Sequence, residues 1–213
     1  MAVPSEERAS GAFAAEQCVE RYMAGFYPYF DPHAGAFVWD RAERRSVIRM
    51  RPQALAVAVR EIRKQRREFE IRTDNDFATT IQLLSNAALR PDTWIKHDVI
   101  SVYATLFTAG YAHTIEAYSQ GQLVGCLLGV HLGEVFCAEA MIGTDKAAPP
   151  YCLYSLVAAY PALGLRVVDV QVSHQPGSAC RKLGEETMTL ADYLALAAPL
   201  MRNPSATFAL SRT

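Results

Sequence analysis

Apolar residues recur along this chain with two different spacings, which predict where helices and strands lie. In some segments they return every three or four residues, as on one face of a helix. In others they alternate or run continuously, as in strands. Helical spacing covers residues 12–25, 52–67, 77–88, 98–109, 149–163 and 190–201. Strand-like spacing covers residues 36–39, 45–50, 69–73, 112–118, 123–132, 134–141 and 166–172.

Turn residues separate these segments and indicate how they connect. Gly121 and Gly133 are expected to join three successive strands into an antiparallel meander. Asp74 or Asp76 is a candidate cap for the helix that begins near residue 77. The aromatic segment 26–33 carries two prolines and is expected to be a loop. A meander followed by a helix, a strand and a helix is an α+β order of elements.

The length and charge of the chain limit its organisation. Its 213 residues, 51% of them hydrophobic, suit one large domain or one domain with a small N-terminal lobe. We expect a lobe at 1–72, a main domain at 73–204 and a loose tail at 205–213. The formal net charge is −1, so any nucleic-acid contact must come from a local basic patch.

Cysteine usage and the N-terminus predict a cytoplasmic protein. The cysteine count is odd and no Cys-x-x-Cys pair occurs, which argues against a disulfide framework and against a zinc site. Free thiols in apolar surroundings behave as small hydrophobic residues. The N-terminus carries acids and no apolar core of a signal peptide, and no apolar run approaches the ~18 residues of a membrane span. The five cysteines are Cys18, Cys126, Cys137, Cys152 and Cys180.

Acidic residues on apolar, strand-like segments are the main chemical signal. Asp169 and Gln171 alternate with valines, so both side chains are expected on one face of a strand. Glu139 lies among small apolar residues. A buried carboxylate is costly unless it is paired, hydrogen-bonded or used in chemistry. These residues are therefore candidates for a catalytic site, with an ordinary half-exposed strand and a structural carboxylate as the alternatives.

A basic stripe is expected on the helix that begins at Pro52. Its four cations are spaced i, i+3, i+4 and i+7 and share one helix face, opposite an apolar face. Such a stripe is either a solvated surface or a contact for nucleic-acid phosphates. The residues are Arg60, Arg63, Lys64 and Arg67.

Four short blocks in a fixed order resemble one enzyme family. They are Tyr111-Ala-His-Thr-Ile-Glu116, Leu123-Val-Gly125, Glu139-Ala-Met141 and Asp169-Val-Gln171. In this order they resemble the leucyl/phenylalanyl-tRNA–protein transferase family, over about residues 21–193. That family moves an amino acid from a charged tRNA to the N-terminal amine of a protein, in the N-end rule pathway of protein degradation. The resemblance implies an acetyltransferase-like (GNAT-type) mixed sheet flanked by helices.

The resemblance also assigns roles to residues of this chain. It implies that Asp169 and Gln171 position and activate the acceptor amine and that Glu139 is a further site acid. By the same resemblance the basic helix contacts the tRNA acceptor stem, while His113 is kept as a structural residue. Aromatic faces suit stacking on the invariant terminal adenosine. The residues implied to surround the donor are Trp39, Trp94, Tyr103, Met141, Leu153, Leu156 and Tyr160.

The chain departs from the family at the rim of the implied pocket. Ala140 replaces the serine of a Glu-Ser-Met stretch, and Pro149-Pro150 replaces a Ser-Lys pair. The loop at 174–184 is about three residues longer than in the family. A changed donor amino acid, or an acceptor amine other than a protein N-terminus, is compatible with these departures.

We therefore expect an aminoacyl-tRNA-dependent transferase with an apolar donor and no metal or organic cofactor. Its acceptor is expected to be a protein or peptide N-terminus, with Arg or Lys as the candidate first residue, and the enzyme is expected to be a monomer without membrane contact. An acyl-CoA-dependent N-acyltransferase is one alternative, but residues 144–150 lack the glycine-rich loop that pyrophosphate binding needs. An inactive tRNA- or peptide-binding relative is another, against which the retention of Glu139, Asp169 and Gln171 argues.

Overall fold

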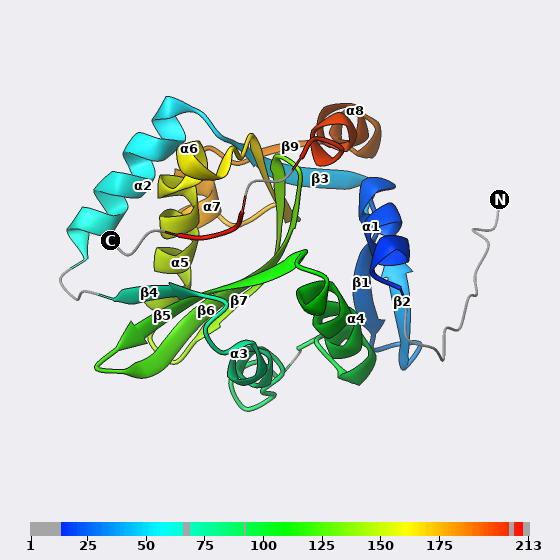
Figure 1. Cartoon of the computed structure of the whole chain (residues 1–213), viewed down its shortest axis with the longest axis horizontal. Coiled ribbons are helices and arrows are strands. Elements are labelled where there is room, and N and C mark those ends of the chain that lie inside the picture. Colours follow the sequence, from blue (N-terminus) through cyan, green and yellow to red (C-terminus); the bar gives the residue numbers. More distant parts are fainter. Residues whose placement is uncertain (1–13, 66–68, 92, 205–206, 211–213) are drawn as a thin grey trace.

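A mixed seven-stranded sheet forms the centre of the protein (Figure 1). The computed structural model describes residues 14–65, 69–91, 93–204 and 207–210. β7 and β8 are parallel and the other neighbouring strands are antiparallel, which confirms the predicted meander and the α+β class. In sheet order the strands are β4 (Glu70–Thr73), β5 (Ala112–Ser119), β6 (Gln122–Leu132), β7 (Val135–Gly143), β8 (Val167–Gln171), β3 (Arg44–Arg49) and β9 (Glu186–Thr189).

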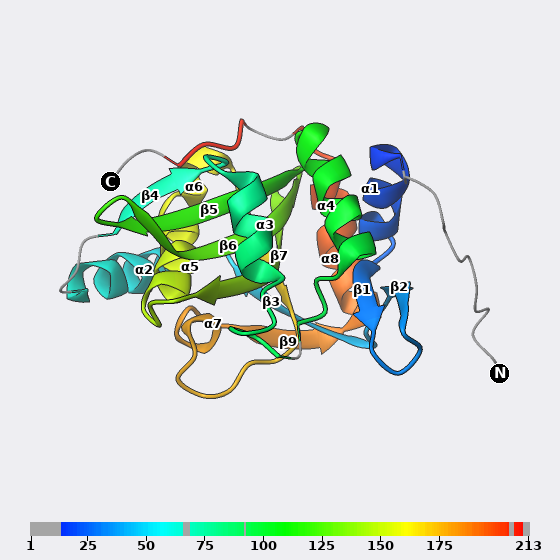
Figure 2. The same ribbon diagram turned by 90° about the horizontal axis from the view of Figure 1, so that it is seen from below.

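Helices cover both faces of this sheet. α5 (Ala148–Ala158) lies on one face, with α2 (Pro52–Lys64) packed outside it. α3 (Phe77–Leu84), α4 (His97–Thr108) and α8 (Leu190–Met201) lie on the other face, as Figure 2 shows for α3 and α4. Because neighbouring strand residues point to opposite faces, Leu127 joins the apolar cluster around α5 and Leu128 joins the cluster around α4.

The aromatic segment that we expected to be a loop is a strand. β1 (Tyr27–Asp31) pairs with β2 (Ala36–Asp40) in a separate two-stranded hairpin beside α1 (Ala15–Met23). Pro28 lies opposite Trp39 in this ribbon. A proline cannot donate to a ladder, but a ribbon strand has a free edge where no donor is needed. The prolines therefore gave a misleading signal here.

Two further local predictions need correction. The helix expected at 149–163 ends at Ala158, and a short helix α6 (Tyr160–Leu163) follows, because Pro161 has no N–H with which to continue the helical ladder. Residues expected to form only a loop before α8 contain the short helix α7 (Ala179–Lys182) and β9. The four residues of β9 are mostly polar, so no apolar pattern marked the strand.

Described residues of the expected lobe and of the expected tail contact the main sheet. The expected boundary at residue 72 falls inside β4, and β3 from the expected lobe pairs with β8. The division into domains at 1–72 and 73–204 stays a prediction. Phe208, in the tail expected to be loose, is instead buried and stacked on His113 with ring centroids 4.3 Å apart. Residues 205–206 and 211–213 lie outside the described part.

Several smaller expectations are decided by the structure. Asp76 rather than Asp74 caps α3, because its carboxylate accepts the Thr79 backbone N–H at 3.0 Å. All five cysteines are buried free thiols, as predicted. Across the described residues, none of the helices has the length and apolar character needed to span a bilayer.

Candidate functional site

Glu139 and Gln171 meet where β7 and β8 lie side by side. The Gln171 side-chain Nε2 donates to Glu139 Oε2 at 2.6 Å, and the buried Tyr103 hydroxyl donates to the same oxygen at 2.9 Å. Glu139 Oε1 is buried and has no hydrogen-bond partner among the described residues. Two predicted site residues are thus in contact, and one carboxylate oxygen remains able to accept a hydrogen bond.

Burial raises the pKa of the Glu139 carboxyl group. Removal of the carboxylate from water raises its pKa to about 7, although the Tyr103 hydrogen bond acts in the opposite direction. A carboxyl group with this pKa changes charge near neutral pH. It is therefore suited to holding or exchanging a proton with a nearby amine.

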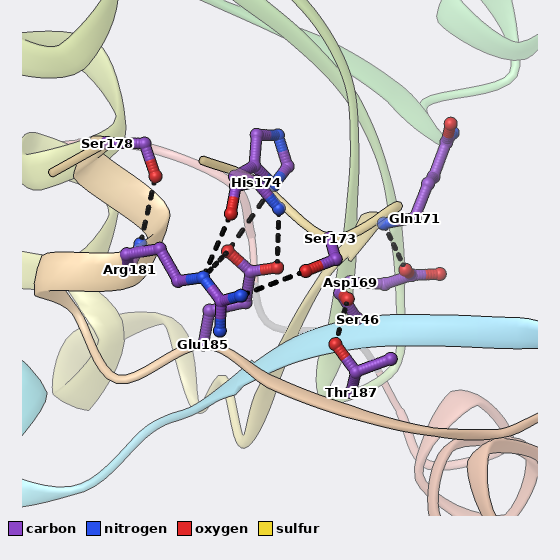
Figure 3. Close-up of polar contacts among 9 residues, drawn as sticks. All are labelled: Ser46, Asp169, Gln171, Ser173, His174, Ser178, Arg181, Glu185 and Thr187. Atoms are coloured by element: carbon purple, nitrogen blue, oxygen red, sulfur yellow. Dashed lines mark hydrogen bonds and ion pairs between the residues drawn. The ribbon is translucent and has the colours of Figure 1, made fainter. Parts of the chain in front are cut away.

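Asp169 is buried behind Gln171. Its carboxylate forms a salt bridge with the buried Arg45 guanidinium and accepts the Tyr193 hydroxyl at 2.8 Å. Its other oxygen accepts the Gln171 backbone N–H at 2.8 Å (Figure 3). Asp169 is fully buried and does not line the neighbouring cavity. The alternation of the strand brought Asp169 and Gln171 near each other, but only Gln171 reaches the cavity.

Gln171 has an unusual backbone conformation at the end of β8. Its φ is +62°, a left-handed value that residues with a Cβ seldom adopt. The hydrogen bond from its N–H to Asp169 stabilises this turn. The turn directs the Gln171 side chain away from Asp169, as Figure 3 shows, and toward Glu139. Strained residues held by their surroundings are often functional, and this one lies in the candidate site.

A cavity of about 220 Å³ opens beside Glu139 and Gln171. This volume is below the ~300–1,000 Å³ of pockets for drug-sized ligands, so it suits one amino-acid side chain rather than a nucleotide. Of the predicted site residues, five line it: Trp94, Glu139, Met141, Leu153 and Gln171. The rest of the lining comes from Arg90, Ala138, Ala140, Val170, Val172, His174 and Cys180.

Four residues expected around the donor do not line this cavity. Leu156 is fully buried in the apolar cluster around α5, and Tyr160 packs at the edge of that cluster. Tyr103 is buried behind Glu139, where it supports the carboxylate. Trp39 packs edge-on against Tyr22, with ring centroids 6.0 Å apart. Their contacts with a substrate stay predictions.

The basic stripe on α2 is partly neutralised. Glu61 accepts Lys64 Nζ at 2.8 Å and Lys182 Nζ at 3.1 Å, and also pairs with Arg60. These hydrogen bonds lower the pKa of Glu61 to about 2, so it is charged at neutral pH. Arg63 is exposed, and Arg67 lies outside the described residues. Contact of this stripe with tRNA stays a prediction.

His113 and Glu116 have partners away from the cavity. His113 Nδ1 lies 2.7 Å from Asp74 Oδ2. Glu116 is fully buried and accepts the hydroxyl groups of Thr114 and Tyr118 at 2.8 Å each. These contacts support a structural role for both residues, in line with the interpretation of His113 from the sequence.

Reasoning from the sequence missed four residues that support or line the site. Arg45 and Tyr193 bind Asp169, and Arg90 and His174 line the cavity. The sequence did carry a signal for Arg45, because it lies next to the apolar run Val47-Ile48. A charged residue that is buried with such a run needs a partner of opposite charge. No comparable local pattern marked the other three.

Comparisons with known proteins give consistent relatives. A sequence model described as leucyl/phenylalanyl-tRNA protein transferase matches residues 49–198. A protein named leucyl/phenylalanyl-tRNA–protein transferase from Thiobacillus denitrificans is 31% identical over 199 residues, which cover 91% of this chain and 83% of that protein. Its namesake from Pseudomonas fluorescens is 27% identical over 186 residues, covering 87% of this chain and 80% of that protein.

One solved structure matches most of the chain, but with low similarity. A functionally unknown conserved protein from Staphylococcus epidermidis matches with a TM-score of 0.43 and 10% identity, covering 84% of this chain and 66% of that one. At this level of similarity the match adds nothing to the account of the fold or the site.

Proposed function

Because the chain belongs to the leucyl/phenylalanyl-tRNA protein transferase family, we propose that it transfers an apolar amino acid from charged tRNA to the N-terminal amine of a protein at the Glu139–Gln171 cavity. The observation that carries the proposal is the pairing of these two side chains beside a cavity of side-chain size. An acetyltransferase-like fold, a monomeric state and a cytoplasmic location belong to the same proposal. The mixed sheet flanked by helices supports the first of these.

In this reaction the main task of the protein is to position the reactants. A neutral acceptor amine attacks the aminoacyl ester carbon, the new amide C–N bond forms, and the ester C–O bond to the terminal ribose breaks. The amine loses a proton and the ribose oxygen gains one. Conversion of an ester to an amide is downhill, so alignment of the reactants and stabilisation of developing charge supply most of the catalysis.

Glu139 and Gln171 are the residues we assign to the reacting groups. Glu139 Oε1, which has no hydrogen-bond partner in the described part of the chain, can accept a hydrogen bond from an amine and stabilise the cation that forms during attack. The Gln171 amide has a fixed orientation, because its Nε2 is bonded to Glu139 and its backbone N–H to Asp169. Asp169 therefore acts as a positioning residue, through Gln171, rather than by direct contact with the amine.

We expect an uncharged, apolar donor side chain at the apolar wall of the cavity, opposite its polar residues Arg90, Glu139 and His174. Trp94, Met141 and Leu153 supply apolar walls. Size selection in such a pocket is modest, about 1–3 kcal/mol per methylene, so we expect a preference among Leu, Phe and Met rather than an absolute choice. The altered rim leaves smaller donors such as Ala in the range to be tested.

The acyl-CoA alternative is less well supported. α5 begins at Ala148-Pro149-Pro150, and two prolines remove backbone N–H groups from the helix end where a pyrophosphate would bind. The exposed Arg63 on α2 is instead available for tRNA phosphates.

A transfer assay with two donors tests the proposal. The protein is incubated with a peptide that begins with Arg and with either labelled leucyl-tRNA or labelled acetyl-CoA; the same peptide with an acetylated N-terminus is the control. Label should enter the free peptide from leucyl-tRNA alone. Acetyl transfer without aminoacyl transfer would overturn the proposal in favour of the alternative.

A further inference from the structure

Three side chains that bind metals elsewhere converge at one wall of the cavity. His174 follows β8, Cys180 lies on α7, and Glu185 precedes β9. One potential ligand atom from each lies within 4.8 Å of the other two. Figure 3 shows the His174 ring and the Glu185 carboxylate turned toward each other, with the Arg181 guanidinium beside them. His174 and Cys180 also line the cavity that holds Glu139 and Gln171.

One oxygen of the Glu185 carboxylate has no hydrogen bond to any residue that the structure describes. The side chain is fully buried, and its Oε1 accepts the His174 backbone N–H at 2.9 Å. This oxygen, Oε2, lies 3.4 Å from His174 Nδ1 and 4.0 Å from Arg181 Nε. His174 Nδ1 is also buried and, within the described ranges, forms no hydrogen bond. Buried polar atoms of this kind need an explanation, because each costs free energy when left unpaired.

The geometry points to a shared ion. Two ligands bound at 2.0–2.2 Å to one tetrahedral ion are separated by roughly 3.4 Å, and His174 Nδ1 lies 3.4 Å from Glu185 Oε2. We propose that His174 Nδ1, Cys180 Sγ and Glu185 Oε2 bind a single divalent ion of the zinc class. Imidazole, thiolate and carboxylate together are a donor set typical of zinc, whereas magnesium and calcium prefer oxygen ligands.

Charge balance allows such an ion beside Arg181. The Cys180 thiol releases a proton and binds as thiolate, so the thiolate and the Glu185 carboxylate together neutralise the dication. Arg181 is held in place by hydrogen bonds to the His174 carbonyl oxygen at 2.9 Å and to Ser173 Oγ at 3.1 Å. It therefore faces a neutral cluster and need not move away.

The ion would connect three separate segments at the cavity wall. His174 is three residues beyond Gln171, so its ligation holds the chain directly after the candidate site against α7 and the start of β9. Three protein ligands leave a fourth position for water or another ligand. The inference does not depend on the proposed transfer reaction, because metal binding is measured without tRNA or peptide.

The competing account is that Glu185 simply pairs with His174 and Arg181, beside an ordinary core thiol. Cys180 does belong to the apolar cluster around α5, and burial together with Glu185 raises the pKa of its thiol to about 12. The two accounts differ in one observable. A core thiol beside an ion pair binds no metal, whereas the proposed site does.

Titration of the intact, chelator-treated protein with cobalt(II) distinguishes the metal site from the ion-pair account. We expect one equivalent to bind, with tetrahedral d–d bands and a thiolate-to-cobalt charge-transfer band, and zinc to abolish both. Cys180→Ser should lose the charge-transfer band. Cys152→Ser, which alters another fully buried thiol of the same cluster, should keep it. Circular dichroism checks that both variants are folded.

A second variant keeps the test decisive if Cys180→Ser does not fold. Glu185→Gln preserves side-chain size and should weaken cobalt binding by more than the roughly 10–100-fold typical of residues outside the ligand set. The absence of a thiolate band in the unmodified protein, its persistence in Cys180→Ser, or unchanged affinity in Glu185→Gln would each overturn the proposal.

Discussion

The buried Glu139 should make the stability of the fold depend on pH in a way that one substitution removes. Its pKa is raised from 4.5 to about 7, chiefly by burial. Below pH 4.5 the carboxyl group is protonated in both the folded and the unfolded chain, so it has no differential effect. Between pH 4.5 and 7 the unfolded chain loses this proton while the folded chain keeps it. The folded state is therefore progressively destabilised as the pH rises through this window.

The size of the effect follows from the shift. A difference of about 2.5 pKa units, at 1.36 kcal/mol per unit, is on the order of 3 kcal/mol in the free energy of unfolding. Glu139→Gln is neutral at every pH and can still accept the Tyr103 hydroxyl and the Gln171 amide. The free energy of unfolding of the native protein, minus that of Glu139→Gln, should fall by about this amount from pH 4.5 to pH 7.5.

Urea denaturation followed by tryptophan fluorescence measures this difference at closely spaced pH values. Other titrating groups are common to both proteins and cancel in the subtraction. Glu20→Gln, which replaces an exposed carboxylate on α1, is the matched control and should track the native protein. If the native and Glu139→Gln curves stay parallel from pH 4.5 to 7.5, burial does not control this carboxyl group and the reasoning about its acidity fails.

Three further predictions concern the residues around Glu139. Asp169→Asn leaves the buried Arg45 without a counter-charge and should cost about 3–5 kcal/mol of stability; adding Arg45→Gln should recover part of it, and a loss below 1 kcal/mol in urea melts would contradict the pairing. Gln171→Ala should abolish aminoacyl transfer while leaving the circular dichroism spectrum unchanged, because the side chain is only half-buried; turnover within a few-fold of the native rate would remove Gln171 from the site. Reversing Arg63 and Lys64 to Glu should weaken tRNA binding and flatten its dependence on salt, since fewer counterions are released; an unchanged slope would show the α2 stripe to be an ordinary solvated face.

Local sequence patterns predicted most of the helices and strands, but few of the residues that hold the site residues in place. The alternation of Asp169 with valines and the small neighbours of Glu139 marked both strands correctly, because periodicity and burial are local properties. The partner of Asp169 could not be predicted in the same way. Arg45 reaches Asp169, 124 positions away in the sequence, only because β3 pairs with β8.

The same limit explains why the sequence did not predict the proposed metal-binding cluster. The cysteine spacing carried no metal motif, and Cys180 was correctly expected to be a buried thiol. Its proximity to His174 and Glu185 depends on α7 and β9, two short elements that apolar periodicity did not mark. The left-handed turn at Gln171 also has no signature in the sequence, since the residue is not a glycine.

The most direct test of the proposed activity compares donors. Purified protein is supplied with one labelled aminoacyl-tRNA at a time, charged with Leu, Phe, Met, Ala, Arg or Asp, and with a peptide acceptor that begins with Arg. Initial rates should be highest for the apolar donors and should disappear in Gln171→Ala. Efficient transfer from arginyl- or aspartyl-tRNA, with none from the apolar donors, would contradict the assignment of the Glu139–Gln171 cavity as the apolar donor site.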